Sequence, residues 1–349
     1  FMMVYDVSHP HGGTGDWCSS GEKIRCVVKN APPLDPPTPD NELRVMTYNI
    51  FERWWFASID GQRERTCRIP LVIASLYPNV DVIAFQELFM AGCWSSDVTF
   101  RDLLVHIGFP HQTKTITSPT KVTNGGIFIA SRWPIIESDD FTFKSADRSS
   151  WDNFSAKGVS YAKIQKGSAV YNVMGTHLQA GRKGDKIEAK VNQSIEWGEF
   201  VKSKNIPVSE PLIFTGDLNA NFYDGESEPE GMFDAIVDNI EAIVPTLVGA
   251  LNASSNPLVN DLQKLKGNDG WGRWIDHVFY SRSHLLPRTP YVEILAPKDE
   301  TPFPICWCEQ CINPLRWSYV YPTPDECSDD IEFVRSLSDH QPVMGTFIF

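Results

Sequence analysis

The sequence predicts an α+β fold, a four-layer α/β/β/α sandwich in which two mostly antiparallel sheets pack face to face between helices. Short apolar runs rich in strand-forming residues recur along the chain, and amphipathic helical segments lie between them. Loops rich in Asp, Asn, Gly and Ser separate these elements, a pattern typical of two covered sheets. With 349 residues, of which 42% are hydrophobic, the chain is long enough to bury the core of one such sandwich.

A proline-rich connector divides the chain. Residues 31–40 read Ala-Pro-Pro-Leu-Asp-Pro-Pro-Thr-Pro-Asp, which forms neither a helix nor a central strand. We therefore expect an N-terminal extension over residues 1–40, with a disulfide loop and the connector, and one main domain over residues 41–349.

The first elements of the main domain follow directly. Residues 43–50 alternate and favour strand formers, which predicts a strand. Residues 62–76 have helical spacing, in which Pro70 either kinks the helix or lies in its first turn. Residues 82–87 form an apolar run that ends on two polar residues, as a buried strand does when its end opens into a cleft.

The later elements repeat this pattern. An amphipathic helix is expected over residues 189–202, because apolar side chains recur there at helical spacing. Further strands are expected over residues 125–130, 159–164, 170–176, 212–215, 275–280 and 343–349.

The net charge of −13 makes a role in coating nucleic acid less favourable, since such proteins neutralise phosphates with many Lys and Arg residues. A single cleft needs few cations, so the acidity excludes a DNA-packaging protein better than a nuclease. No apolar run reaches the roughly 18–20 residues that a membrane-spanning helix needs.

The eight cysteines form an even set that is typical of disulfides in an extracellular protein. Local pairing predicts Cys18–Cys26 and Cys67–Cys93, with two bridges among the last four. The alternative for those four is a zinc site of Cys306, Cys308, Cys311 and Cys327. Glycosylation sequons at Asn153, Asn192 and Asn252 agree with secretion, so we expect a secreted, glycosylated, disulfide-bonded protein.

Polar clusters interrupt or follow the apolar runs. Burying an unpaired carboxylate or imidazole is costly, so these clusters are expected to converge on one another and on a cation at a common rim. They are Thr47-Tyr48-Asn49, Gln86-Glu87, Gly175-Thr176-His177-Leu178-Gln179, Gly216-Asp217-Leu218-Asn219, Trp274-Ile275-Asp276-His277 and Ser338-Asp339-His340.

The residue types suit hydrolysis of a phosphate ester. Glu87 and Asn49 offer oxygen ligands for Mg²⁺, which keeps much of its hydration shell. His340 can take a proton from water while Asp276 fixes its tautomer.

A second group would contact the phosphate. Asp217 and Asn219 are two residues apart and point the same way from a strand end. Asn219 can donate to a phosphate oxygen while Asp217 holds water or the base. A protonated His177 would stabilise developing negative charge.

In their order and spacing, these clusters resemble the endonuclease/exonuclease/phosphatase superfamily, whose fold is deoxyribonuclease I-like. The resemblance covers residues from about 42 to 349, nearly everything after the connector. It depends on Asn49, Gln86-Glu87, Gly216-Asp217-Leu218-Asn219 and Ser338-Asp339-His340.

Within that superfamily the chain resembles bacterial-type neutral sphingomyelinases (sphingomyelinase C). The matching segments come from all parts of the main domain. They are Gly125-Gly126-Ile127, Ser131-Arg132-Trp133-Pro134-Ile135, Lys157-Gly158, Gly175-Thr176-His177-Leu178-Gln179-Ala180, Asn192-Gln193, Lys202-Ser203-Lys204-Asn205-Ile206-Pro207 and Gly231-Met232-Phe233.

The resemblance implies Mg²⁺-dependent cleavage of sphingomyelin to ceramide and phosphocholine, with Mn²⁺ or Co²⁺ as possible replacements for Mg²⁺. It makes residues 41–349 a catalytic phosphodiesterase domain that acts peripherally on membranes. The metal ligands would be Glu87 and Asn49, with Asp339 on the metal side of the cleft. The general base would be His340, oriented by Asp276, and the phosphate would contact His177, Asp217 and Asn219.

Two departures from the family pattern stand out. Ile275-Asp276-His277 replaces a Leu-Asp-Tyr type of segment, so His277 could compete for the proton or the metal. The segment 301–336 is longer and bears cysteines where the bacterial enzymes carry an exposed aromatic hairpin. Its aromatic residues either contact the membrane or pack against a disulfide-held loop; they are Phe303, Trp307, Trp317, Tyr319 and Tyr321.

Three other functions remain open at this point. A nuclease on the same fold should carry a basic groove, and a phosphatase for inositol phosphates should carry extra lysines and arginines. An inactive membrane-binding module would have no chemical need for the full set of clusters. Neither a nucleic-acid partner nor an obligate protein partner is expected.

Overall fold

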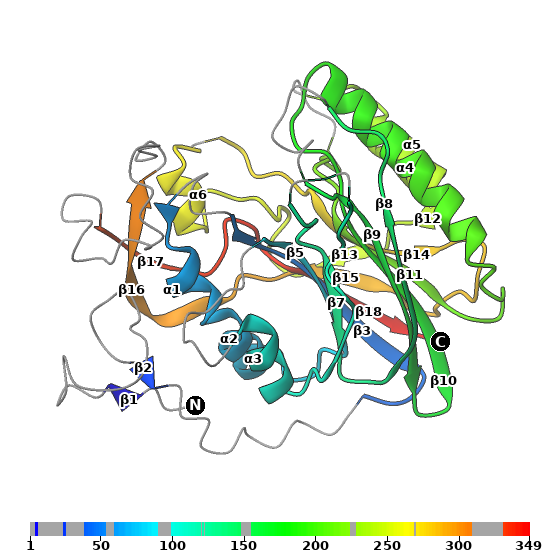
Figure 1. Ribbon diagram of the computed structural model, residues 1–349, viewed down its shortest axis with the longest axis horizontal. Coiled ribbons are helices and arrows are strands. Elements are labelled where there is room, and N and C mark those ends of the chain that lie inside the picture. Colours follow the sequence, from blue (N-terminus) through cyan, green and yellow to red (C-terminus); the bar gives the residue numbers. More distant parts are fainter. Residues whose placement is uncertain are drawn as a thin grey trace.

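The computed structural model describes residues 4–5, 24–25, 38–53, 59–89, 99–119, 121, 123–147, 155–223, 228–268, 270–308 and 331–349. Within these residues two large sheets pack face to face and helices lie on both outer sides (Figure 1). The α+β sandwich predicted from the sequence is confirmed.

One sheet has six described strands in the order β12-β14-β11-β10-β9-β8. The pair β10–β11 is parallel and the other neighbours are antiparallel. Its strands are β8 (Ile135–Thr142), β9 (Gly158–Lys166), β10 (Ala169–His177), β11 (Leu212–Asp217), β12 (Ala242–Ile243) and β14 (Asp276–Ser281).

The other sheet has seven described strands in the order β13-β15-β18-β3-β5-β7-β6. The pairs β3–β5 and β13–β15 are parallel and the rest are antiparallel. Its strands are β3 (Glu42–Glu52), β5 (Val82–Leu88), β6 (His111–Gln112), β7 (Phe128–Ser131), β13 (Thr246–Val248), β15 (Tyr291–Ile294) and β18 (Val343–Ile348).

Three apolar clusters explain the layers. Val45 and Ala84 of one sheet meet Val173 and Ile213 of the other in the cluster between the sheets. The remaining two clusters lie on the outer faces, under helices that supply their own apolar stripes. The helices are α1 (Gln62–Thr66), α2 (Ile69–Leu76), α3 (Phe100–His106), α4 (Asp185–Ser203), α5 (Met232–Asn239) and α6 (Asp261–Leu265).

Aromatic packing fixes the helical layer beneath the seven-stranded sheet. Phe85 of β5 stacks on Phe128 at 5.1 Å and meets Phe100 of α3 edge-on at 5.2 Å. Each such pair adds about 0.5–1.5 kcal/mol beyond the burial of its area. None of the helices in the described part of the chain is long and apolar enough to cross a membrane.

Two smaller sheets lie beside the sandwich. The first contains β4 (Ile59–Asp60), β16 (Lys298–Cys308) and β17 (Ile331–Ser336), and the second pairs β1 (Val4–Tyr5) with β2 (Ile24–Arg25). Most of residues 1–37 lies outside the described residues. The division into an extension and a main domain therefore stays a prediction.

Local chemistry explains where the predicted boundaries shift. The helical segment 62–76 is two helices, and Pro70 lies in the first turn of α2, one of the two expected places. The strand expected from residue 125 begins only at Phe128, because Gly126 has a left-handed φ of 64°. The prediction omitted α3, which starts at a capping box formed by Thr99 and Asp102.

Candidate active site

The register of the strands brings the predicted polar clusters to one edge of the sandwich. His177 ends β10 directly opposite Asp217 at the end of the parallel strand β11. Asp276 begins the antiparallel strand β14 and is paired with Asp217. Asn49 of β3 is paired with Gln86 of β5 in the other sheet, so four strand ends and one strand start meet at this edge.

Left-handed backbone turns direct side chains into the site. Glu87 has φ 60°, Asn219 has φ 50° and Phe51 has φ 53°, all unusual for residues with a Cβ atom. Gly126 permits the turn at Glu87, since a Cβ atom at Gly126 would lie 3.0 Å from the Glu87 Cα. Such conformations concentrate at functional sites, where the surrounding structure maintains them.

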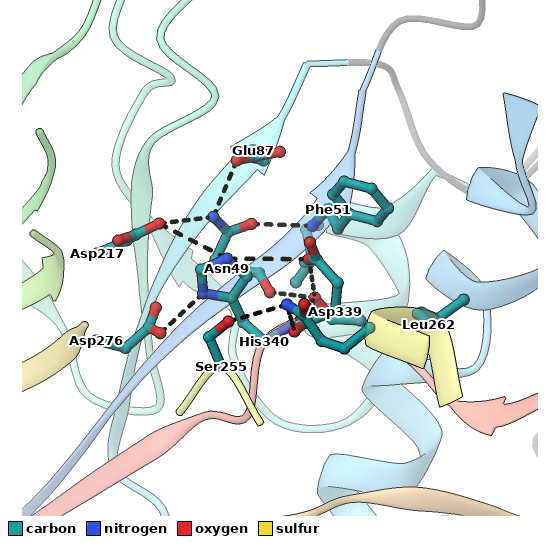
Figure 2. A network of polar contacts seen from close by, with 12 residues as sticks. Asn49, Phe51, Glu87, Asp217, Ser255, Leu262, Asp276, Asp339 and His340 are labelled. Carbon is teal, nitrogen blue, oxygen red and sulfur yellow. Dashed lines mark hydrogen bonds and ion pairs between the residues drawn. The ribbon is translucent and has the colours of Figure 1, made fainter. Parts of the chain in front are cut away.

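One half of the site gathers the carboxylates of Glu87 and Asp217 around the side-chain amide of Asn49 (Figure 2), with the imidazole of His177 beside them. Asn49 Nδ2 donates to Glu87 Oε1 and to Asp217 Oδ2, each at 3.0 Å. Asn49 Oδ1 accepts from the backbone amide of Phe51, and the side-chain nitrogen of Asn49 therefore faces the carboxylates. His177 Nε2 lies 3.4 Å from Asp217 Oδ2 and 3.9 Å from Glu87 Oε1. These residues form the side of the site suited to a metal.

The other half is a histidine–aspartate pair. His340 Nδ1 and Asp276 Oδ2 are 2.8 Å apart, which is the distance of a strong hydrogen bond. The Ser254 hydroxyl accepts from the Asp276 amide, and Trp274 Nε1 donates to the Asp276 carbonyl. His340 Nε2 lies 3.9 Å from Asp217 Oδ2, so the ring links the two halves. The pairing expected for a general base and its orienting carboxylate is therefore present.

Negative charge dominates the electrostatics of the site. Burial opposes the protonation of His340, but the carboxylates of Asp276, Asp339 and Asp217 together raise its pKa. Burial would raise the pKa of Asp217, but His340 and His177 lower it. A raised pKa keeps the imidazole protonated, and a protonated ring cannot accept a proton from water. Part of the surrounding negative charge must therefore be offset if His340 is to act as a base at neutral pH.

The described residues contain two groups of side chains that could hold a metal ion. They are Glu87 with His177 and Asp217, and Asp217 with Asp276 and His340. Within each group the ligand atoms lie within 4.8 Å of one another. The donors of the first group are two carboxylates and an imidazole, a set that fits a divalent cation. Such a cation would also offset part of the negative charge of the carboxylates.

Asp339 belongs to neither of these groups. Its Oδ2 forms an ion pair with Lys266 Nζ at 2.7 Å, and its Oδ1 lies 3.9 Å from His340 Nε2. Burial opposes its ionisation, but Lys266 and His340 lower the pKa of Asp339 to about 2. Its expected contact with the metal stays a prediction.

Asn219 lies beside Asp217 as the two-residue spacing predicted. The backbone N–H of Asn219 donates to Asp217 Oδ1 at 2.8 Å, and its side-chain Nδ2 donates to the Leu178 carbonyl at 3.2 Å. Lys190 of α4 donates to the Asn219 carbonyl. The turn that carries Asn219 is therefore held on three sides.

Several basic residues around the site were not predicted. Lys157 Nζ lies 3.2 Å from His177 Nε2 and donates to the Leu178 carbonyl at 2.8 Å. Lys266 and Arg53 both lie over the Phe51 ring, at 4.5 and 4.2 Å from its centroid. Long side chains reach the site from other elements. Only the position of Lys157 before a strand gave any sequence signal.

His277 has a structural role. Its ring packs on Phe233, Trp274 and Phe279 at centroid distances of 4.9, 5.1 and 5.2 Å, and its Nε2 contacts the Ala220 carbonyl at 3.3 Å. It follows Asp276 on β14, so its side chain points to the opposite face of the sheet. It does not compete with His340.

We expect His277 to make the protein sensitive to acid. Burial lowers its pKa in the folded state to about 3, against an ordinary value of 6.5. Below pH 6.5 the unfolded chain binds a proton that the folded protein refuses until about pH 3. The free energy of unfolding therefore falls by up to about 1.4 kcal/mol per pH unit across that window. Urea unfolding as a function of pH should show a smaller acid-side loss in His277→Gln. An unchanged pH slope would contradict this account.

The predicted membrane-contact residues are only partly described. Trp317, Tyr319 and Tyr321 lie outside the described residues. Trp307, on β16, is half-buried and packs against the outer core cluster, where Phe303 is buried. Of the two predicted roles, membrane contact or packing, Trp307 and Phe303 show packing.

The structure has Cys67 and Cys306 each in a disulfide. Cys306 therefore does not serve as a zinc ligand, which removes the alternative raised from the spacing. The other six cysteine side chains lie outside the described part of the structure, so the proposed pairing stays a prediction.

Comparisons with known proteins agree with this geometry. The chain is 29% identical over 332 residues to sphingomyelinase C of Bacillus cereus, covering 88% of this chain and 89% of that protein. It is 28% identical to a phospholipase C of Staphylococcus aureus, covering 92% of each. A magnesium-bound beta toxin structure from Staphylococcus aureus shares the fold, with a TM-score of 0.71 and 24% identity over 88% of this chain and all of that one. The model of the Endonuclease/Exonuclease/phosphatase family matches residues 46–340, so the chain belongs to this family.

Proposed function

We propose that the chain is a Mg²⁺-dependent phosphodiesterase that hydrolyses sphingomyelin to ceramide and phosphocholine. The observation that carries the proposal is the juxtaposition of the His340–Asp276 pair with Glu87, His177 and Asp217 at one strand edge. The names of relatives aligned over most of their length, sphingomyelinase C and phospholipase C, support the choice of substrate.

The proposed reaction is attack of water on phosphorus. His340 Nε2 accepts a proton from the water, while Asp276 accepts the Nδ1 hydrogen bond and stabilises the imidazolium that forms. The bond from phosphorus to the ceramide oxygen breaks, and that oxygen takes a proton from solvent to leave as the hydroxyl of ceramide, while His340 returns its proton to solvent. Asn219 would stabilise the negative charge that develops on the phosphoryl oxygens once its Nδ2 leaves the Leu178 carbonyl, and His177 would do so from beside the cation site.

Glu87, with His177 and Asp217 beside it, would hold the cation. A bound divalent cation supplies Lewis-acid polarisation of the phosphate and a lower pKa for water. Mg²⁺ is the ion we propose because the site is built mainly from carboxylates, and the imidazole would let Mn²⁺ or Co²⁺ replace it. Asn49 positions both carboxylates through Nδ2, and its oxygen would join the ligands only if the side-chain amide turned away from the Phe51 amide.

The same proposal includes secretion and peripheral action on membranes. An enzyme on a bilayer lipid must contact that bilayer, and β17 carries Phe333 with 68% of its surface exposed. Of the sequons in the described residues, Asn252 lies exposed in a loop and Asn192 lies within α4. The even cysteine count is consistent with an extracellular protein.

A substrate comparison tests the proposed function. With Mg²⁺, the chain should release phosphocholine from sphingomyelin vesicles faster than from phosphatidylcholine vesicles, and it should leave double-stranded DNA intact. EDTA should abolish release, and added Mg²⁺ should restore it, because Glu87 and Asp217 need the cation to complete the site. Cleavage of DNA without turnover of lipid would refute the sphingomyelinase assignment while retaining the family.

A further inference from the structure

Arg65 of α1 is a fully buried arginine just behind the active site. Its Nε donates to the Asp60 carbonyl at 2.9 Å, and its Nη2 forms an ion pair with Asp60 Oδ1 at 2.9 Å. The charge is therefore neutralised by a side chain that is itself fully buried. Asp60 fixes the plane of the guanidinium and leaves its outer edge for other partners.

The outer edge of the guanidinium joins two segments that are far apart in sequence. Arg65 Nη1 donates to the carbonyls of Ile50 and Leu337, both at 3.0 Å, and Nη2 donates to the Phe51 carbonyl at 2.6 Å. Ile50 and Phe51 directly follow Asn49, and Leu337 precedes the Ser338-Asp339-His340 cluster. One side chain thus contacts the backbone on both sides of the site.

These carbonyls lie where the sheet no longer supplies partners. The pairing of β3 with β18 ends at Thr47, and its pairing with β5 is interrupted between Asn49 and Glu52. The interruption coincides with the left-handed turn at Phe51, whose amide holds Asn49 Oδ1. A buried carbonyl without a donor costs about 1–3 kcal/mol, so this backbone depends on Arg65.

A second connection runs parallel to Arg65. The Ser338 hydroxyl donates to the Asn49 carbonyl at 2.6 Å, and the His340 amide donates to Ser338 Oγ at 3.2 Å. Ser338 fixes one point of the loop, and Arg65 fixes the residue before it. The two connections together determine how far His340 lies from Asn49 and its carboxylate partners.

We propose that Arg65 is a positioning residue that holds the metal side of the site, through Asn49, in register with the base side, through His340. The inference deepens the proposed function and rests on it. It follows from the planar fork of arginine, because four backbone carbonyls and a carboxylate are bound at once. Lysine keeps the positive charge but cannot reproduce this geometry.

The substitution Arg65→Lys tests the proposal. We expect kcat for phosphocholine release to fall about 10- to 100-fold, as for other groups that orient ligands, with little change in KM. The Mg²⁺ concentration that gives half-maximal activity should rise. The Mg²⁺-induced increase in Tm, which does not depend on turnover, should shrink.

Arg132→Lys is the matched control. Arg132, like Arg65, binds several backbone carbonyls: it donates to those of Pro78, Val80 and Ile107, and it lies over the Phe109 ring. None of these partners belongs to the site. This variant should lose Tm while keeping the wild-type kcat and the wild-type response to Mg²⁺.

Several outcomes separate the possibilities. If Arg65→Lys keeps the wild-type kcat and response to Mg²⁺, or if Arg132→Lys loses both to the same degree, the positioning role is overturned. Should Arg65→Lys fail to fold, Asp60→Asn, which removes the charge that orients the guanidinium, undergoes the same measurements with the same expectations. If wild-type protein turns over no sphingomyelin, the proposed function fails, and the Mg²⁺-induced change in Tm alone judges Arg65.

Discussion

Replacing His340 by alanine is expected to lower kcat for phosphocholine release by about 10²- to 10⁴-fold, the usual contribution of a positioned general base. The ring is the one that Asp276 holds at 2.8 Å, and its other nitrogen faces Asp217. Without it, nothing in the His340–Asp276 pair can take the proton from water. Steady-state kinetics on sphingomyelin vesicles, with circular dichroism to confirm folding, would measure the effect.

His111→Ala provides the control for this experiment. His111 lies on β6, at the far edge of the seven-stranded sheet, and should leave kcat unchanged. Asp276→Asn should also reduce kcat, because the imidazolium loses its charged partner. A His340→Ala variant with near wild-type kcat would remove His340 from the chemistry.

Glu87→Gln should nearly abolish turnover. The substitution removes one of the two carboxylates that Asn49 bridges, and with it the charge that attracts a divalent cation. Metal assistance is worth several kcal/mol and each 1.36 kcal/mol is tenfold, so we expect a loss of about 10³-fold. The Mg²⁺-induced rise in Tm should disappear as well.

Glu293→Gln is the control for Glu87. Glu293 lies on β15 of the same sheet and belongs to neither metal-binding group of the described residues. It should keep both the activity and the Mg²⁺-induced rise in Tm. If Glu87→Gln still responds to Mg²⁺ like the wild-type protein, the cation binds elsewhere.

The site could be predicted from the sequence where a polar residue ends an apolar strand. Glu87, Asp217 and Asp276 each lie at a strand end or start, and burial without partners would be too costly for all three. Strand pairing then turns three separate positions in the sequence into neighbours. The fold class followed from the same alternation of apolar runs and polar loops.

The supporting residues could not be predicted this way. Lys157, Lys266 and Arg65 reach the site through long side chains from elements whose positions depend on tertiary packing. For His277 the error was the reverse, since its position beside Asp276 suggested a role in the site that it does not have. The alternation of a strand places it among aromatic rings on the other face.

The identity of the products is the most direct test of the central claim, that water attacks phosphorus and displaces ceramide. Sphingomyelin vesicles would be hydrolysed with Mg²⁺ in ¹⁸O-labelled water, and the products would be analysed by mass spectrometry. The account predicts phosphocholine carrying one ¹⁸O atom and unlabelled ceramide, because the bond from phosphorus to the ceramide oxygen breaks. Labelled ceramide, or free choline in place of phosphocholine, would contradict it.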